Sequence, residues 1–348
     1  MNDKAQNNPF DGSNPFSHKF IKRPTNFSFE NIKGIIPERF QSYAQSMHIA
    51  VDRPELKVLK TAFYGPRDVC LKLICCDDDE KFRRAIYECE VTELFRGTPG
   101  IVWLLDCDID YTQKRVALLE EKEISLADFF NQNDLEPLNI VHIGTGILDS
   151  LLRIKKAGFL YIDIHPGNLY YNEKHVKIGD FGSVLKLEEV PEYHGLTGAK
   201  NFMAPEVWKE KVYSEQSVIY STGMVLYWIM NRCTPPFMPI RTNEEAFEKR
   251  MAGEAFPDPQ ILQKYPEFME PLYSCIKKMT AYNPADRYES FDEARKALAV
   301  IGYDFLINEM EHSPSISFYV GNGEDETTIP EIPYYNHTIN DLGRDDLS

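Results

Sequence analysis

The chain has 348 residues and a formal net charge of −16 at pH 7, with 43% hydrophobic and 26% charged side chains. This composition is typical of a globular protein and excludes collagen-like and wholly low-complexity classes. The negative charge disfavours nucleic acid or an anionic membrane surface as the main partner.

Neither a membrane span nor a secretory signal is expected. The longest apolar stretch, residues 218–230, is shorter than the roughly 20 residues needed to cross a bilayer. The first residues lack the basic and apolar regions of a signal peptide. We therefore expect a cytoplasmic protein whose cysteines are reduced.

The two ends differ in composition from the middle of the chain. Residues 1–40 are rich in Asn, Ser, Pro and Phe without a sustained hydrophobic period, which predicts a disordered arm. The arm contains Asn8-Pro9-Phe10 and Asn14-Pro15-Phe16, tripeptides that look like ligands of EH domains and indicate an EH-domain-type partner. A coincidental repeat in an Asn- and Pro-rich arm is the alternative. Residues 303–348 carry ten acidic residues against one arginine, which predicts an acidic, mostly disordered tail.

Between these ends, residues 41–302 form the predicted folded domain. Residues 41–122 hold short apolar and β-branched runs, which predict strands, around one amphipathic helix at 80–95. The strands are expected at 57–63, 68–74, 101–106 and 115–120. Residues 123–302 are mostly helical, with the most apolar helices expected at 138–157, 218–230, 271–281 and 292–301. A small strand-rich lobe before a larger helical lobe makes an α+β, two-lobed fold.

Three short segments carry the chemistry, in a fixed order. They read Tyr-Ile-Asp-Ile-His-Pro-Gly-Asn-Leu at 161–169, Lys-Ile-Gly-Asp-Phe-Gly at 177–182 and Asn-Phe-Met-Ala-Pro-Glu at 201–206. Upstream stands Val-Cys-Leu-Lys at 69–72. In this order, the segments resemble those of the eukaryotic-type protein kinases over about residues 45–302.

The resemblance implies a small antiparallel sheet above a helical lobe, with ATP bound between them. It implies that Asn168 and Asp180 hold Mg²⁺, a hard cation that prefers oxygen ligands. Asp163 matches the residue that accepts the proton of the substrate hydroxyl. Lys72 matches the residue that contacts the α- and β-phosphates, and it needs an acidic partner on the helix at 80–95.

That partner is Glu88 or Glu90. Residues 85–88 look like the family's helix sequence, which favours Glu88. Glu90 would place the apolar Leu94 four residues further on, where the family packs an apolar side chain, whereas Glu88 places Thr92 there.

Two further segments extend the resemblance. Residues 118–122 look like the lobe-connecting hinge, so Glu120 and Lys122 are predicted to bind the nucleotide there. Residues 283–287 resemble the segment whose arginine pairs with the glutamate of Ala-Pro-Glu, which predicts an ion pair between Glu206 and Arg287.

The sequence also departs from the family, which makes the chain a divergent member. Residues 50–55, which should cover the phosphates, contain no glycine, so the glycine-rich loop is not recognisable. The usual His and Arg before the catalytic Asp are Tyr161 and Ile162, and we expect Tyr161 to fill the space by packing. The Asp that normally braces the catalytic loop is Val218. A further Lys–Thr pair is replaced by His165 and Ala199.

Taken together, these motifs predict an ATP- and Mg²⁺-dependent protein kinase with a protein substrate, with serine or threonine favoured over tyrosine. Two alternatives stay open. The missing glycines and Val218 favour a pseudokinase that acts as a binding scaffold. The Asp-Ile-His-Pro-Gly-Asn wording favours a small-molecule kinase of the aminoglycoside or choline type.

Overall fold

The structure is a computed structural model that describes residues 36–41, 47–53, 58–63, 69–130, 137–238, 242–263 and 266–312. Both Asn-Pro-Phe tripeptides and the tail beyond 312 lie outside these residues. The disordered arm was predicted to reach residue 40, but Ile36 and Phe40 are buried against the sheet of the small lobe. They are apolar and four residues apart, so a short turn at 38–41 packs both onto one surface.

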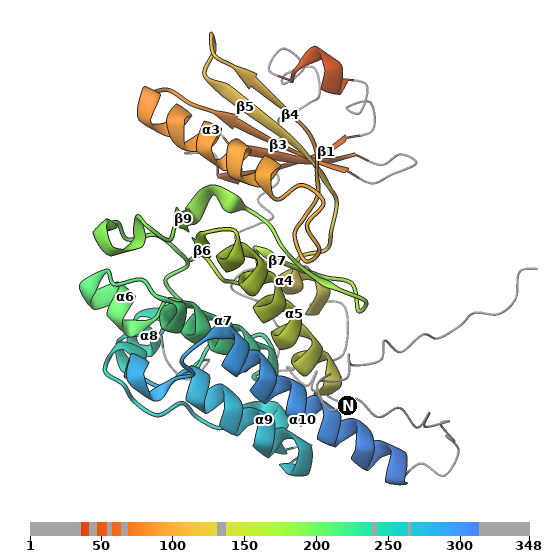
Figure 1. The fold of residues 1–348 in the computed structure, drawn as a ribbon, viewed down its shortest axis with the longest axis vertical. Helices are drawn as coiled ribbons and strands as arrows, with labels where there is room; N and C mark the ends of the chain where they lie inside the picture. Colours follow the sequence, from red (N-terminus) through yellow and green to blue (C-terminus); the bar gives the residue numbers. More distant parts are fainter. Residues whose placement is uncertain are drawn as a thin grey trace, which may run out of the picture.

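The small lobe is a five-stranded antiparallel sheet with one long helix on one face (Figure 1). The strand order is β1-β2-β3-β5-β4. The strands are β1 (Met47–Arg53), β2 (Val58–Phe63), β3 (Val69–Cys75), β4 (Leu104–Asp110) and β5 (Arg115–Glu121). Helix α3 (Asp79–Leu94) begins at Asp78, whose side chain accepts the Lys81 N–H.

Alternation along the strands divides the sheet into two apolar faces. Leu71 and Leu73 of β3 pack with Phe40 on the face away from α3. Ile74, two positions from Lys72, packs on the opposite face with Phe82 and other side chains of α3. Lys72 therefore points toward α3.

One strand differs from its prediction. The strand expected at 101–106 is β4, which runs from Leu104 to Asp110. Ile101 instead forms an isolated parallel bridge with Ile178 in the large lobe. The alternating aspartates at 106, 108 and 110 hid the strand from the hydrophobic pattern.

The large lobe is mainly helical (Figure 1). Its helices are α4 (Leu126–Phe130), α5 (Pro137–Lys156), α6 (Pro205–Glu210), α7 (Glu215–Met230), α8 (Asn243–Met251), α9 (Pro266–Met279) and α10 (Phe291–His312). Two short antiparallel pairs lie at the junction with the small lobe: β6 (Phe159–Tyr161) with β9 (Val184–Lys186), and β7 (Leu169–Tyr171) with β8 (Val176–Ile178). No helix in the described ranges has both the length and the apolarity needed to cross a membrane.

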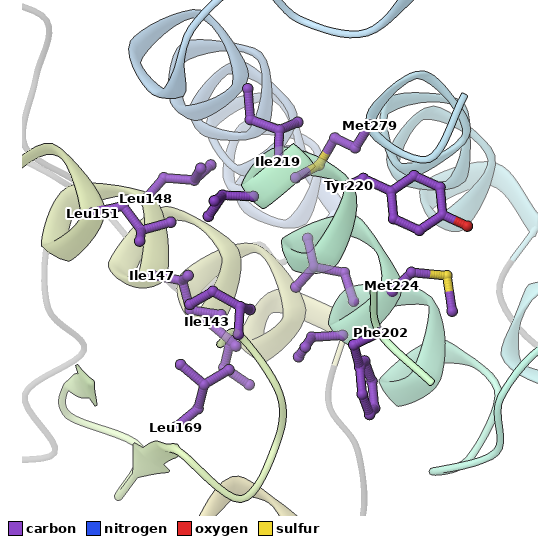
Figure 2. Packing of buried hydrophobic residues seen from close by; sticks show 14 of the residues in the cluster. Ile143, Ile147, Leu148, Leu151, Leu169, Phe202, Ile219, Tyr220, Met224 and Met279 are labelled. Carbon is purple, nitrogen blue, oxygen red and sulfur yellow. The ribbon is translucent and has the colours of Figure 1, made fainter. Parts of the chain in front are cut away.

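Helix α7 lies at the centre of this lobe and is buried on all sides from Ser217 to Met230. Figure 2 shows Ile219 and Met224 of α7 among side chains of α5 and Met279 of α9. A helix that is apolar all round requires neighbours all round. The surrounding helices and the short strands are thereby held in fixed positions.

Helix α10 is longer than predicted and packs along α5. It was expected to end at 301, with the tail beginning at 303, but it continues to His312. Gly302 made a helix end plausible, yet no proline follows until Pro314, and the acidic residues after Tyr303 can occupy an exposed helix face. Residues 303–312 therefore belong to the folded domain.

The predicted ion pair between Glu206 and Arg287 is confirmed. The guanidinium makes two bonds to the carboxylate, of 2.6 and 2.9 Å, and is itself fully buried. It also donates to the carbonyl oxygens of Gln216, Ala281 and Tyr282. The pair ties α6 to the segment between α9 and α10.

We predict that Arg287→Met lowers the free energy of unfolding by about 3–5 kcal/mol, because it leaves Glu206 buried without a counter-ion. Urea denaturation followed by circular dichroism measures this loss. The matched control is Arg84→Met, which removes an exposed i,i+4 pair with Glu80 and should leave the midpoint unchanged. Equal midpoints for the two variants would contradict the structural role of the pair.

Candidate active site

Three charged side chains meet where the two lobes face each other. The ammonium of Lys72 on β3 donates to Glu88 of α3 and lies 2.9 Å from Oδ1 of Asp180, which follows β8. Lys72 is 5% exposed and Glu88 7% exposed. A buried ammonium is costly without counter-charges, and two carboxylates from separate elements supply them. The cluster therefore holds β3, α3 and the β8 end in one arrangement.

Of the two acidic residues considered as partners of Lys72, Glu88 is the one in contact. Glu90 is exposed, and Leu94 is 60% exposed. Thr92 can be buried on the face of α3 that carries Glu88, because its hydroxyl donates to the Glu88 carbonyl oxygen at 2.6 Å. The argument for Glu90 assumed that a polar residue could not be buried at this position.

The apolar contact expected from Leu94 comes instead from Phe95, the residue that ends α3. Its ring stacks on Phe181 with centroids 5.2 Å apart. Tyr161 packs edge-on against Phe181, with ring centroids 5.6 Å apart. These rings connect α3 to the segment that carries Asp180.

Tyr161 does more than the packing that was expected of it. Its hydroxyl donates to the Gly179 carbonyl oxygen at 2.6 Å and lies 3.2 Å from that of Asp180. Burial raises the pKa of Tyr161 well above its ordinary value, so the hydroxyl keeps its proton and remains a donor. Tyr161 therefore fixes the backbone of Asp180 directly.

The backbone of Asp180 has a left-handed conformation, with φ 62° and ψ 78°. A non-glycine residue adopts this region at a cost, and such residues cluster at functional sites. Gly182 has a separate reason to be glycine, since a Cβ there would lie 2.9 Å from Oε2 of Glu88. The missing side chain lets α3 approach Asp180.

Asn168 and Asp180 are neighbours because of the β7–β8 hairpin. Leu169 pairs with Ile178, and the Gly179 N–H donates to the Asn168 carbonyl oxygen at 3.0 Å. The hairpin thus brings both residues to its open end. The carboxylate of Asp180 and the amide oxygen of Asn168 are hard oxygen donors, a set that fits Mg²⁺ with water or phosphate completing its shell.

Asp163 lies in the loop between β6 and β7. Its Oδ1 accepts the Ala199 N–H at 3.0 Å, and its carbonyl oxygen accepts from the Asn168 side chain at 3.2 Å. Val218 cannot supply the hydrogen bonds of the absent aspartate, so these contacts brace the loop instead. The loop is therefore held partly by the segment at 197–199.

His165 lies beside Asp163 and is 8% exposed. Its Nδ1 accepts the Gly167 N–H at 3.1 Å, so a neutral ring carries its proton on Nε2. Nε2 lies 3.7 Å from Oδ1 of Asp163. The ring thus presents a donor nitrogen toward the carboxylate and holds the turn at Gly167.

The hinge between the lobes is held by an ion cluster that the sequence did not indicate. Lys177 of β8 contacts Glu121 and Glu123 at 2.6 Å each, and the Trp103 N–H donates to Glu121 at 2.7 Å. Burial alone would lower the pKa of Lys177. The hydrogen bonds to the two glutamates have the larger combined effect, so the net result is a raised pKa.

The predicted hinge residues Glu120 and Lys122 flank Glu121, and both are half-buried. Glu120 pairs with Cys70 of β3 and Leu104 of β4 in the sheet. Of the glycine-free stretch at 50–55, residues 50–53 belong to β1, whereas Pro54 and Glu55 lie outside the described residues.

The comparisons with known proteins agree with this geometry. Residues 66–299 match the family model described as a protein kinase domain. A probable serine/threonine-protein kinase, nek2, of Dictyostelium discoideum is 30% identical over 180 residues, 50% of this chain and 39% of that protein. A putative serine/threonine-protein kinase of Acanthamoeba polyphaga mimivirus is 26% identical over 234 residues, 63% of this chain and 83% of that protein.

A calcium/calmodulin-dependent protein kinase type II of Caenorhabditis elegans is 27% identical over 179 residues. The match covers 50% of this chain and 23% of the worm protein. The chain thus matches less than half the length of the worm and Dictyostelium relatives.

We predict that Tyr161→Phe keeps the ring packing but lowers the free energy of unfolding by about 1–2 kcal/mol, because buried carbonyl oxygens lose their donor. Urea denaturation measures the loss, and hydrogen–deuterium exchange should rise at residues 179–182. Tyr111→Phe, at a ring that is 70% exposed, is the control and should change neither. Wild-type stability and exchange in Tyr161→Phe would show that the hydroxyl does not hold this segment.

Proposed function

The chain belongs to the protein kinase family, and on this premise we propose that it transfers the γ-phosphoryl group of ATP to a protein hydroxyl. The observation that carries the proposal is the buried cluster of Lys72, Glu88 and Asp180, with Asp180 in its left-handed conformation. Phosphoryl transfer depends on positioning and charge neutralisation, and this cluster positions charged groups between two lobes.

Each polar residue has a role in this proposal. Lys72, kept extended by Glu88, binds the α- and β-phosphates. Asn168 and Asp180 hold Mg²⁺, which neutralises charge on the phosphates. The hinge backbone near Glu120 and Lys122 binds the adenine edge.

Asp163 is the proposed catalytic base. Its Oδ1 is oriented by the Ala199 N–H, which leaves Oδ2 to accept a hydrogen bond from the substrate hydroxyl. The hydroxyl proton passes to this carboxylate as the oxygen bonds to phosphorus and the ADP oxygen leaves. His165 presents Nε2 toward Asp163 at 3.7 Å from Oδ1, which helps to orient the carboxylate.

We propose serine or threonine rather than tyrosine as the acceptor. The Dictyostelium and mimivirus relatives are named as serine/threonine kinases, which supports this choice. A protein substrate is favoured over a small molecule by α6, which contains the Pro-Glu of Ala-Pro-Glu, and by the pair between Glu206 and Arg287. The glycine-free stretch at 50–55 favours the pseudokinase alternative, which the first experiment tests.

We predict that Asp163→Asn lowers kcat by about 10²–10⁴-fold, because the amide cannot accept the proton. Transfer of labelled γ-phosphate to generic protein substrates, with phosphoamino-acid analysis, measures it. Asp149→Asn, at a half-buried position of α5 paired with Arg295 of α10, is the control and should be as active as wild type.

Three other outcomes would change the proposal. Full activity of Asp163→Asn would remove this residue from the mechanism. Label only on amino alcohols or aminoglycosides would indicate a small-molecule kinase. Wild-type protein that neither transfers phosphate nor binds MgATP would indicate a pseudokinase scaffold.

We predict that Asp180→Ala loses Mg²⁺-dependent nucleotide binding, because only Asn168 remains of the two proposed metal donors. Isothermal titration with ATP, with Mg²⁺ or with excess chelator, measures the difference. The wild type should bind more tightly with Mg²⁺, and the variant should bind equally weakly in both conditions. Asp304→Ala, at an exposed position of α10, should behave as wild type. A variant that binds MgATP with wild-type affinity would contradict the metal role.

A further inference from the structure

Arg250 of helix α8 reaches into the large lobe and contacts a loop far away in sequence. It is 3% exposed. Its Nη1 donates to the Met203 carbonyl oxygen at 2.5 Å, and its Nη2 donates to the Lys200 carbonyl oxygen at 2.6 Å. A single guanidinium thus bridges two carbonyl groups of the loop that precedes α6.

The environment of Arg250 is unusual for a buried charge. Within the described part of the chain, its guanidinium forms no ion pair with a carboxylate. Its other contacts are the Tyr220 hydroxyl at 3.5 Å and the rings of Phe247 and Tyr220, at 5.2 and 6.0 Å. Burying a cation without a counter-ion is costly, so the two carbonyl bonds have to offset this cost.

The loop in turn depends on Arg250. In the described part of the chain, the loop at 199–204 has two backbone hydrogen bonds of its own. The N–H groups of Phe202 and Met203 both donate to the Ala199 carbonyl oxygen. Among the described residues, no backbone N–H reaches the carbonyl oxygens of Lys200 and Met203. Buried carbonyl groups need a donor, and Arg250 supplies it for both.

Helix α8 also holds the side chain of Lys200. The Lys200 ammonium lies over the rings of Phe247 and Trp208, at 4.1 and 5.2 Å, and 3.1 Å from Glu244. Backbone and side chain of Lys200 thus both contact α8, and Trp208 of α6 adds a second ring beside the ammonium.

The loop held by Arg250 is continuous with the group that orients Asp163. Ala199, directly before Lys200, donates its N–H to Oδ1 of Asp163 at 3.0 Å. Residues 197–199 and Met203 also line a small void together with buried side chains of the large lobe, among them Ile164 and Phe202. An acceptor hydroxyl has to approach Asp163, and the loop at 199–203 is joined directly to the N–H group that orients this carboxylate.

We propose that Arg250 is a positioning residue that holds residues 199–203 beside Asp163 and thereby shapes the surface on which the acceptor polypeptide binds. This proposal rests on the proposed function. It assigns Arg250 to the binding of the protein acceptor and not to the binding of ATP, for which Lys72 is the proposed contact.

The test compares Arg250→Met and Arg250→Lys with the wild type and with Lys249→Met, the adjacent residue, whose side chain contacts Glu254 and Phe237 instead. Steady-state kinetics gives KM for a phosphoacceptor protein and KM for ATP separately. Hydrogen–deuterium exchange at 199–204 is measured on the same proteins without substrate, so this readout does not depend on catalysis.

For Arg250→Met we expect KM for the acceptor to rise about tenfold or more, with KM for ATP within about twofold of wild type. Exchange should rise at 199–204 while α5 and α7 stay protected. Arg250→Lys keeps the charge and one of the two hydrogen bonds. Its acceptor KM and its exchange at 199–204 should therefore lie between those of wild type and Arg250→Met. Lys249→Met should behave as wild type.

An unchanged acceptor KM with unchanged exchange at 199–204 would overturn the proposal. Equal losses in both KM values, with exchange raised across α5 and α7, would also overturn it, because Arg250 would then support the lobe as a whole. If Arg250→Met does not fold, Arg250→Lys decides by the same two readouts. If the wild type transfers no phosphate, the proposed function fails, and the exchange data still decide whether Arg250 holds the loop.

Discussion

The buried ammonium of Lys72 is the charge on which the arrangement of the two lobes depends. Its counter-charges come from α3 in the small lobe and from the residue after β8 in the large lobe. Such an ion pair is costly to break. If either carboxylate is removed, the buried ammonium of Lys72 loses one of its two counter-charges. The sheet, the helix and the hairpin are thus joined by this ion cluster as well as by apolar contacts, among them the stacking of Phe95 on Phe181.

The same cluster explains why the polar groups around Asp180 are arranged as they are. A left-handed backbone at Asp180 persists only if its surroundings determine it. The Tyr161 hydroxyl does so by its hydrogen bonds to the backbone, and the packing of Phe181 against Phe95 and Tyr161 fixes the next residue. A tyrosine at this position is therefore compatible with a working site, because an uncharged donor of sufficient reach is all that the backbone carbonyls require.

Local patterns predicted most of the fold and the polar residues of the site, because these residues lie in short contiguous segments with strict spacing. Helix α3, three of the four strands given ranges and the pair between Glu206 and Arg287 were found in this way. The parts that were missed depend on contacts distant in sequence. Nothing near Lys177 or Arg250 indicates that the first holds the hinge and the second a loop almost fifty residues earlier. The end of α10 was missed for the opposite reason, since Gly302 gave a local stop that packing against α5 overrides.

Tyr220 links the two buried arginines of the large lobe that hold α6 and the loop before it. Its ring lies between two guanidinium groups, 4.8 Å from Arg287 and 6.0 Å from Arg250. Burial raises the pKa of Tyr220 although both cations lower it, so the ring stays neutral and separates two positive charges. One arginine holds α6 through Glu206, and the other holds the loop before it through carbonyl oxygens. Because the loop and α6 are continuous, a chain whose buried helix carries Val218 in place of an acidic brace still has the segment at 199–206 fixed at both ends.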